Sequence, residues 1–506
     1  MTISGKATAE GTAVYRSDHP SLTYVPLSDT GLLISQAGFG GYRINLDNGW
    51  QEQALRFALQ NGINLLDTSS NYGDGGSERL MGRMVAEMID NGELQRAQVV
   101  IVSKVGYIQG FNFALAKQRK AEGRPFPNVV AYDDGLEHCI HPEFIEDQLT
   151  RSLERLDMET IDVYLLHNPE YYLMREARIT GVDRKAATDE YYRRIRMAFT
   201  YLETEVANGR IQYYGISANT FPEAASEFTH TDLHRVWEIA TDIAADHHFR
   251  LVQMPLNLFE TGAATEKNQP HDQTTLQSAA EKNLAVLINR PLNAIWQNTV
   301  TRLADVPTPN YPATSEDVST AVDSLLKMEN HFQQTLLTQI DVDEDSRNVI
   351  RECLAIGTML EGRWGGFGTY QNWQEIRTRF ILYRARTAID YIYEQENLPE
   401  ELPIWLDNYI EAVNEALAAV TAFYQERSSK EATHIKKTAV AADPEWEAET
   451  LSQTAVRALL STKGVTSVLV GMRQQPYVED VLQGLEQPIE VKERDESWLA
   501  CKRVDV

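Results

Sequence analysis

Cysteine is scarce in this chain of 506 residues. Its three cysteines, Cys139, Cys353 and Cys501, are an odd number without a Cys-x-x-Cys spacing, so the sequence indicates neither a disulfide framework nor a thiolate zinc site. His138 and His141 lie near Cys139 and could chelate a soft metal, but no second pair of ligands is visible. We therefore predict free thiols and no metal site.

Long apolar runs and positive charge are also lacking. No window approaches the roughly 20 apolar residues that cross a bilayer. The N-terminal segment MTISGKATAEGTAVYRSD has no basic start followed by an apolar stretch. With 47 Lys and Arg against 73 Asp and Glu, the formal charge is −26, which repels nucleic acid and anionic lipid. We expect a cytoplasmic protein that binds neither nucleic acid nor a membrane.

The sequence has the composition of a large folded α/β protein. Hydrophobic residues make up 43% and charged residues 24%, as in globular proteins. Outside one long interruption, short apolar runs alternate with amphipathic stretches such as 144–156 and 193–206, which is typical of βα units. The candidate strands are 32–40, 63–66, 98–103, 161–166, 211–216, 251–254, 284–288 and 465–470. Eight such strands favour a (β/α)8 TIM barrel over an open sheet, with residues before 31 as a short hairpin that closes its bottom.

The interruption lies between the seventh and eighth candidate strands. It opens with a proline-rich segment and then shows helical patterns, with capping-box spacing at Thr314 and Asp317 and again at Asn372 and Glu375. Apolar residues four and three apart predict one long stripe, and the polar tract that follows, 425–437, suggests a solvated linker. The stripe comprises Leu406, Ile410, Val413, Leu417, Val420 and Tyr424. We predict a barrel formed by 1–293 and 449–506, with an all-helical subdomain, 294–448, inserted between strands 7 and 8.

Polar residues end the apolar runs, and in a (β/α)8 barrel the active site lies at the C-terminal ends of the strands. These residues are Asp67, Lys104, His167, Ser217, Gln253 and Arg290, with Tyr72 five positions beyond Asp67. A cationic Lys104 near Tyr72 would bring the phenol pKa of about 10 closer to neutrality. Tyr72 would then protonate a developing alkoxide, Asp67 would hold Lys104, and His167 could donate to the same carbonyl oxygen.

The motifs around these residues are shared by one family. The segments are NLLDTSSNYGDGGSERLMG, VIVSKVG, YLLHNPE, YGISANT, LVQMPLN and TSVLVGMR. They resemble the aldo-keto reductases, NAD(P)H-dependent barrel enzymes that reduce aldehydes and ketones, over about 31–293 and 449–485. Carried over by position, the family's catalytic tetrad falls on the four residues Asp67, Tyr72, Lys104 and His167.

The resemblance also implies a hydride donor, for which we expect NADPH. The family binds its dinucleotide without a Gly-x-Gly-x-x-Gly loop, and this chain has none in the matching region. Arg473, in a segment that resembles the adenosine-phosphate site, would bind the 2′-phosphate, and Asp480 matches an acidic adenine contact. The implied cofactor residues are Gly40, Gly41, Tyr42, Asp67, Ser217, Asn219, Gln253, Arg290, Arg473 and Asp480.

The chain departs from the family pattern at the cofactor site. Ser217-Ala218-Asn219 stands where the family usually has Ser-Asn, and Asn289-Arg290 stands where many members stack a tyrosine on the nicotinamide. Arg290 would either cover that face or bind a substrate anion. The inserted subdomain is outside the family's usual plan. Because it grows from a βα loop, we expect it over the active-site mouth as a lid, with a partner-binding appendage as the alternative.

The sequence favours an NADPH-dependent oxidoreductase that reduces a small aldehyde or ketone, or oxidises the alcohol, with Tyr72 as general acid and base. One alternative is a non-catalytic redox sensor that binds the dinucleotide and uses the helical insertion to bind a protein partner. A barrel hydrolase would need a second acid at a strand end besides Asp67, and the sequence offers none.

Overall fold

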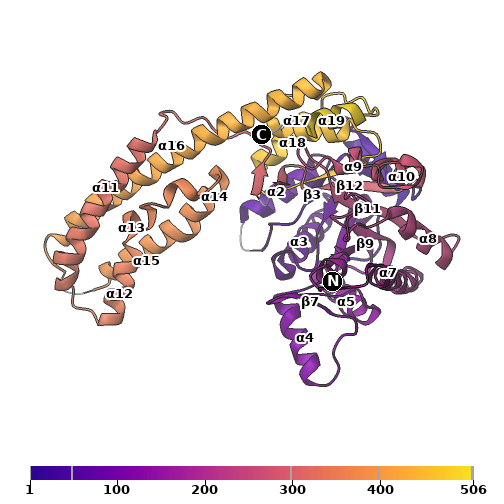
Figure 1. Ribbon diagram of the computed structural model, residues 1–506, viewed down its shortest axis with the longest axis horizontal. Helices are drawn as coiled ribbons and strands as arrows, with labels where there is room; N and C mark the ends of the chain where they lie inside the picture. Colours follow the sequence, from indigo (N-terminus) through magenta and orange to yellow (C-terminus); the bar gives the residue numbers. More distant parts are fainter. Residues whose placement is uncertain (1, 47–48, 297–298, 396–397, 503–506) are drawn as a thin grey trace. The chain divides into compact units, whose positions relative to one another are not determined.

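The computed structural model describes residues 2–46, 49–296, 299–395 and 398–502, and the chain forms two compact units. The barrel unit comprises Met1–Leu303 and Lys437–Val506, and the helical unit comprises Ala304–Lys436 (Figure 1). The helical unit is shorter at both ends than the predicted insertion, 294–448. A hairpin, β13 (Asn293–Trp296) and β14 (Thr299–Arg302), precedes it, so the insertion contains strands as well as helices.

The barrel unit is built on a closed parallel barrel, in which the described residues form eight strands. In barrel order these are β3 (Ala37–Gly40), β4 (Leu65–Asp67), β5 (Val100–Val105), β9 (Ile161–His167), β10 (Ile211–Ser217), β11 (Phe249–Pro255), β12 (Ala285–Asn289) and β15 (Ser467–Val470). The prediction of a (β/α)8 barrel with a helical subdomain before the last strand is confirmed.

Continuous apolar runs form these strands because a barrel strand is buried on both faces. Every residue of β5 and β9 is buried, including the polar residues near their ends. Gly215 in β10 lies where the pairing with β11 shifts register, and a Cβ there would be 2.0 Å from the Leu251 carbonyl oxygen. The close approach of the two strands therefore requires glycine at this position.

Helices follow the strands and surround the barrel (Figure 1). They include α2 (Gly49–Gln60), α3 (Gly76–Asp90), α5 (Pro142–Leu156), α7 (Arg184–Ala207), α8 (Leu233–Ile243), α10 (Thr275–Glu281), α17 (Leu451–Leu460), α18 (Gln475–Leu485) and α19 (Asp495–Lys502). Asp183 and Asp232 accept backbone N–H groups in the first turns of α7 and α8, which fixes where these helices begin. Helix α7 ends at Ala207, with Asn208 as its C-cap and Gly209 in the left-handed conformation that commonly follows a helix.

The N-terminal residues close one end of the barrel. They form α1 (Ala9–Asp18) and the antiparallel hairpin of β1 (Tyr24–Pro26) and β2 (Leu33–Ser35). Leu27, Leu32 and Ile34 join the cluster of buried residues inside the barrel. The predicted first strand, 32–40, is thus two strands: the first half caps the barrel end and only Ala37–Gly40 belongs to the barrel.

Longer βα connections lie at the opposite end of the strands. After β5 come α4 (Phe111–Ala121) and a small sheet of β6 (Tyr107–Ile108), β8 (Leu136–His138) and β7 (Val130–Asp133). After β9 comes α6 (Tyr171–Glu176), and after β11 comes α9 (Gly262–Thr265).

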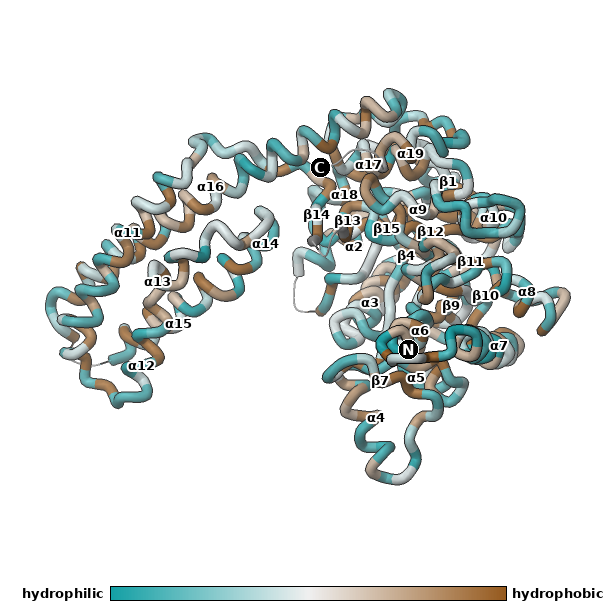
Figure 2. Tube along the Cα trace, in the orientation of Figure 1, coloured by the Kyte–Doolittle hydropathy of each residue, from teal (hydrophilic) through white to brown (hydrophobic). Residues whose placement is uncertain are grey.

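The helical unit has a core of its own. Its helices include α11 (Ser315–His331), α12 (Glu344–Cys353), α13 (Ile356–Leu360), α14 (Tyr370–Ile376), α15 (Tyr383–Tyr393) and most of α16 (Leu402–Ala442). Hydrophobic and hydrophilic residues alternate along α11 and α16, as in amphipathic helices (Figure 2). The buried cluster contains Leu325, Trp373 and Leu406.

Two details of this unit differ from the sequence predictions. The tract 425–437 is no linker, because α16 continues through it with Ala432 and Ile435 buried at helical spacing. Helix α14 is capped by Thr369 instead of Asn372, whereas the capping box at Thr314 and Asp317 is confirmed. In the apolar stripe Ile410 is 37% exposed, whereas the neighbouring Tyr409 is fully buried.

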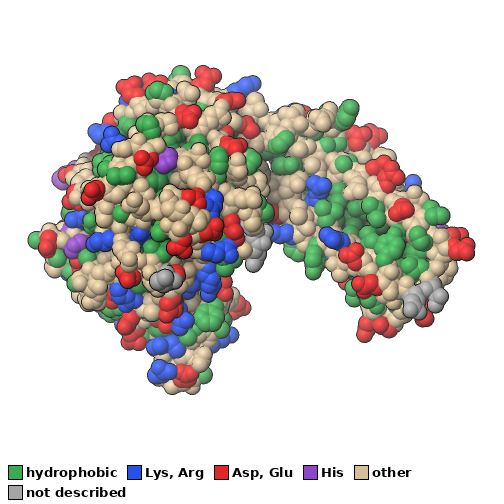
Figure 3. Space-filling model, turned by 180° about the vertical axis from the view of Figure 1, so that it is seen from behind, with side chains coloured by type: hydrophobic (Ala, Val, Ile, Leu, Met, Phe, Trp, Pro, Cys, Tyr) green, Lys and Arg blue, Asp and Glu red, His purple; other side chains and the backbone are tan. Residues whose placement is uncertain are grey.

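Some large apolar side chains of the helical unit remain exposed. Phe380 is 60% and Tyr383 68% exposed, and hydrophobic side chains gather on the face of this unit seen in Figure 3. All three cysteines are free, as predicted. Among the described residues, no helix combines the length and apolar character that crossing a membrane requires.

Candidate active site

A buried ion pair lies at the C-terminal ends of β4 and β5. Lys104 Nζ is 2.7 Å from Asp67 Oδ2 and also donates to the Thr68 carbonyl oxygen at 2.8 Å and to the Tyr72 hydroxyl at 3.4 Å. Lys104 is fully buried, so its charge must be compensated locally, and Asp67 supplies the compensation. These contacts bring Asp67, Tyr72 and Lys104 together, as the sequence predicts.

The expected direction of the Tyr72 pKa is wrong. Burial, together with the Asp67 carboxylate and Tyr42, raises the pKa of Tyr72 well above its ordinary value. The sequence argument counted the charge of Lys104 but not that Asp67 neutralises it or that the phenol is desolvated. Tyr72 is therefore held as a neutral phenol, which is a proton donor.

His167 ends β9 beside this pair. Its Nδ1 is 3.1 Å from Ser69 Oγ, and its ring meets the Tyr72 ring edge to face with centroids 5.8 Å apart. Burial lowers the pKa of His167 well below its ordinary value, with smaller contributions from Lys104 and His138. The imidazole is neutral at physiological pH and is held in orientation by Ser69.

Ser217 and Gln253 extend the network across the barrel. Ser217 Oγ donates to Gln253 Oε1 at 3.0 Å, and Gln253 Nε2 donates to Asp67 Oδ1 at 2.8 Å. The two residues, expected as nicotinamide contacts, are thus hydrogen-bonded to each other, and Gln253 is also hydrogen-bonded to the ion pair. In this arrangement Gln253 fixes the carboxylate that compensates Lys104.

The end of β12 carries a second ion pair. Arg290, with φ of 53°, pairs with Glu260 at 2.5 Å and donates to Asn219 Oδ1 at 3.3 Å. Its Nε atom and the Asn289 Oδ1 atom are buried without a hydrogen-bond partner in the described structure. These two polar atoms remain available to a bound molecule. The ion pair with Glu260 restrains Arg290. The sequence alone left open whether Arg290 contacts the cofactor or the substrate.

Glu170, three residues past His167, is a buried carboxyl that the sequence analysis missed. Its Oε1 accepts the Asn219 N–H at 2.8 Å, while Oε2 is buried without a partner in the described structure. Burial raises the pKa of Glu170 to about 8. The signal was present in the segment YLLHNPE, which continues past the strand-end histidine.

The remaining predicted cofactor residues lie around the ends of β3 and β15. Gly40 and Gly41 have a packing reason to be glycine, since a Cβ on Gly41 would lie 2.5 Å from Ser77 Oγ and one on Gly40 3.1 Å from the Val470 carbonyl oxygen. Tyr42 is 65% exposed and meets the Tyr72 ring edge to face, with centroids 5.2 Å apart.

Arg473 and Asp480 follow β15. Arg473 is half-buried, three residues past the strand. Asp480 in α18 accepts hydrogen bonds from Thr450 at 2.9 Å, from Gln453 at 3.0 Å and from Ser452. The carboxylate of Asp480 is therefore already bonded to the start of α17, which supplies a structural reason for an acid at that position.

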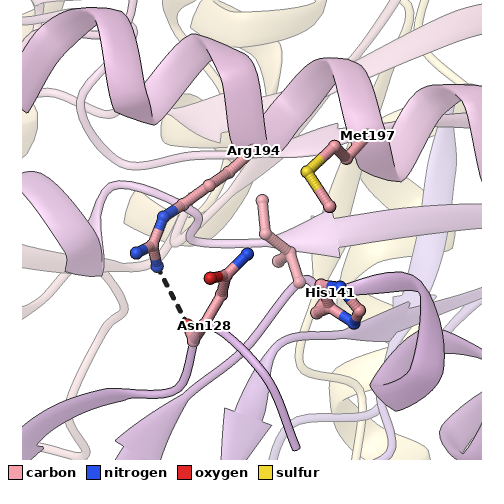
Figure 4. A pocket seen from close by; sticks show the side chains of 5 residues that line it. Asn128, His141, Arg194 and Met197 are labelled. Carbon is pink, nitrogen blue, oxygen red and sulfur yellow. Dashed lines mark hydrogen bonds between the residues drawn. The ribbon is translucent and has the colours of Figure 1, made fainter.

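A small cavity between α5 and α7 lies apart from these residues. Asn128, Ile140, His141, Arg194 and Met197 line it, and Arg194 Nη1 donates to the Asn128 carbonyl oxygen at 2.9 Å (Figure 4). Burial raises the pKa of the neighbouring Cys139 thiol to about 12, so this thiol is not a reactive thiolate. Among the described residues no group of His, Cys, Asp or Glu is arranged to hold a metal ion.

Comparison with known proteins gives one family. A model described as the aldo/keto reductase family matches residues 38–315. An NADH-specific methylglyoxal reductase of Escherichia coli is 30% identical over 151 residues, 28% of this chain and 41% of that protein. A probable voltage-gated potassium channel subunit beta of Arabidopsis thaliana is 27% identical over 152 residues, 29% of this chain and 38% of that protein.

These alignments cover only part of each protein: the chain spans about two fifths of the length of the curated relatives it matches. Among solved structures, an aldo-keto reductase of Bacillus halodurans in its holo form is similar to 96% of this chain and 98% of that chain, with 14% identity and a TM-score of 0.46.

Proposed function

The chain belongs to the aldo/keto reductase family, and from this premise we propose that it is an NADPH-dependent oxidoreductase that reduces an aldehyde or ketone, or oxidises the corresponding alcohol. The observation that carries the proposal is the contact of the buried Lys104 with both Asp67 and the Tyr72 hydroxyl. A neutral phenol beside a compensated ammonium, at the catalytic end of a barrel, suits a proton donor for a carbonyl oxygen.

The chemistry of the residues at the strand ends fits a nicotinamide dinucleotide. When bound, this cofactor supplies the hydride that reduces the carbonyl carbon. The buried unpartnered Asn289 Oδ1 could accept from a carboxamide, and Arg473 could bind a phosphate. The preference for NADPH over NADH rests on Arg473, while one relative is named as NADH-specific.

Each of the four side chains Asp67, Tyr72, Lys104 and His167 has a separate role at the substrate oxygen. The Tyr72 hydroxyl donates its proton to the oxygen as negative charge develops there, and Lys104 stabilises the phenolate that remains. Asp67, fixed by Gln253, keeps Lys104 charged in a buried site. His167, neutral and oriented by Ser69, provides a second polar contact for the substrate. A positioned general acid typically contributes about 10²- to 10⁴-fold in rate.

The experiment is a fluorescence titration with NADPH, followed by absorbance assays at the nicotinamide band with a panel of aldehydes and ketones. Tyr72→Phe should bind NADPH as the wild type does and lose about 10²- to 10⁴-fold in rate. Tyr311→Phe, at a tyrosine that is 86% exposed in the helical unit, is the matched control. Retention of most of the rate by Tyr72→Phe would exclude the proposed proton donor. NADPH binding without turnover of any carbonyl would favour the redox-sensor alternative.

A further inference from the structure

The imidazole ring of His167 is packed against two tyrosine rings. The Tyr72 ring meets it edge to face with centroids 5.8 Å apart, and the Tyr107 ring does so at 4.8 Å. The backbone of His167 is held as well, because His138 Nε2 donates to its carbonyl oxygen at 2.7 Å. A Cβ on Gly106 would lie 2.4 Å from that oxygen, so this close approach requires glycine. These contacts keep the two nitrogens of the His167 ring in distinct surroundings.

One of these nitrogens belongs to a short chain of hydrogen bonds. Ser69 Oγ donates to Asn71 Oδ1 at 2.6 Å and lies 3.1 Å from His167 Nδ1. A separation of 2.6 Å is typical of O–H···O bonds, whereas N–H···O bonds are longer. Ser69 has a single hydroxyl proton, and this proton lies in the bond to Asn71. Ser69 Oγ can therefore only accept from His167, so Nδ1 carries a proton.

The other nitrogen of the ring, Nε2, carries no proton. Burial, with smaller contributions from Lys104 and His138, lowers the pKa of His167 well below its ordinary value, so the ring is neutral and has one N–H group. Because that N–H group is at Nδ1, Nε2 is a hydrogen-bond acceptor. In the described part of the chain no group donates to it. A ligand that binds Nε2 must therefore supply the hydrogen.

This tautomer determines which part of a substrate His167 can bind. A carbonyl oxygen only accepts hydrogen bonds, so it gains none from an unprotonated Nε2. Donation from His167 to the carbonyl oxygen, which the sequence suggested, would require the opposite tautomer. A cationic donor would be repelled by Lys104, whose charge acts on the His167 ring. A neutral hydroxyl group is the donor that fits.

We propose that Asn71 is a positioning residue that acts through Ser69 to keep His167 Nε2 unprotonated, and that the site binds carbonyl compounds with a hydroxyl group on the carbon next to the carbonyl. The carbonyl oxygen accepts the proton of Tyr72, and the neighbouring hydroxyl donates to Nε2. Because the Tyr72 and His167 rings are in contact, one small substrate can reach both. The carbonyl part of this inference rests on the proposed function.

Nuclear magnetic resonance of the full-length protein with isotope-labelled histidine reads the tautomer without turnover. Among the 11 histidines, the signals of His167 are those lost in His167→Gln. The wild type should show the Nδ1–H form. Asn71→Leu removes the acceptor, so the Ser69 hydroxyl can donate to Nδ1 and the ring proton should move to Nε2. Asn71→Asp keeps an acceptor oxygen and should retain the Nδ1–H form.

Steady-state kinetics test the substrate class with two pairs: hydroxyacetone against methoxyacetone, and glycolaldehyde against methoxyacetaldehyde. An ether oxygen accepts hydrogen bonds but cannot donate them. The wild type should prefer the hydroxyl member of each pair. In Asn71→Leu this ratio of kcat/KM values should fall by about tenfold, because Nε2–H can donate to the ether oxygen. Comparing ratios between proteins cancels the intrinsic reactivities of the substrates. Asn91→Leu, at an exposed asparagine that follows α3, is the control and should keep the wild-type ratio.

Ser69→Ala is a second variant, in which the loss of the hydroxyl should let both tautomers appear and lower the ratio less than Asn71→Leu does. An Nε2–H form in the wild type, or an unchanged ratio in Asn71→Leu, would overturn the inference, and in a protein that reduces these carbonyls the reductase would still stand. A changed ratio without a change of tautomer would also overturn it, because Asn71 would then not act through His167. An Nδ1–H form in a protein that reduces no member of either pair would retain the role of Asn71 and reject both the reductase and the substrate class.

Discussion

Gln253 donates a hydrogen bond to Asp67 across the interior of the barrel, with 2.8 Å between Nε2 and Oδ1. Four steps around the barrel separate their strands, β11 and β4, so the two side chains come from opposite walls. The hydrogen bonds of Gln253 in the described structure do not involve Tyr72. Because Asp67 compensates the charge of Lys104, Gln253 nevertheless affects the geometry of the proton donor through these two residues.

We predict that Gln253→Met slows turnover and shifts its pH dependence. Burial raises the pKa of Asp67, and the hydrogen bond from Gln253 is one of the contacts that lowers it. Without that bond the pKa of Asp67 rises, so the acidic limb of the kcat/KM profile should move to higher pH. Ser217→Ala keeps the bond between Gln253 and Asp67 and should shift the limb less. Superimposable limbs in wild type and Gln253→Met would contradict this role.

Lys104→Met should abolish carbonyl reduction and destabilise the barrel. The substitution leaves the Asp67 carboxylate buried and unpaired, which typically costs about 3–5 kcal/mol. The double variant Asp67→Asn, Lys104→Met removes both charges, so its free energy of unfolding should recover while its activity does not. Chemical denaturation of the single and double variants measures this; equal stability of the two would show that the ion pair does not govern folding.

Glu170 should make the protein less stable as the pH rises. Its pKa is raised to about 8 in the folded state against an ordinary value of 4.5, so between these pH values the folded state holds a proton that the unfolded state has lost. The free energy of unfolding therefore falls with pH in this window. Glu170→Gln mimics the protonated carboxyl and should flatten that slope. Urea denaturation at pH 5, 6, 7 and 8 compares the two proteins, and parallel slopes would count against a protonated Glu170.

Glu329 should stabilise the helical unit alone. Its carboxylate accepts the Gly357 N–H at 2.6 Å, the Thr358 N–H at 3.1 Å and the Tyr409 hydroxyl at 3.1 Å. Glu329→Ala leaves these donors without an acceptor, which should cost at least about 2 kcal/mol. Calorimetry should show a lower transition for the helical unit and an unchanged one for the barrel. Glu411→Ala, at an exposed glutamate on α16, is the control and should change neither.

The barrel could be predicted because its signals are local. Each apolar run is long enough to form a buried strand, and every predicted strand overlaps an observed one. The division of the predicted strand 32–40 into β2 and β3 could not be predicted in the same way. Leu33 and Ile34 would be apolar in a strand that lines the barrel and equally in one that caps its end. The polar tract before Lys437 was misjudged for a related reason: Glu, Lys and Ala favour a helix wherever one face is buried.

The site residues could be predicted from their positions at strand ends, but the hydrogen bonds and ion pairs that connect them could not. The sequence places Asp67, Lys104 and His167 at one face of the barrel, whereas the partners of Gln253 and Arg290 are set by contacts between distant residues. Glu260 carries no pattern that distinguishes it from other loop residues, and although Ser69 lies in a quoted motif, its hydrogen bond to His167 is not visible from the sequence. Burial, which determines the direction of the Tyr72 pKa, is likewise a property of the folded chain.

The barrel is interrupted before its last strand, and this affects how the chain is made. On the ribosome, β12 and β3 present open edges until β15 emerges to pair with both. At about 5–20 residues per second, the roughly 180 residues between Asn289 and Ser467 take about 9–36 s to translate. During that interval the nascent chain carries seven barrel strands with two unpaired edges, which are templates for aggregation. A chain that stalls in the insertion therefore leaves an open sheet, in which β12 and β3 lack the partner strand that β15 supplies.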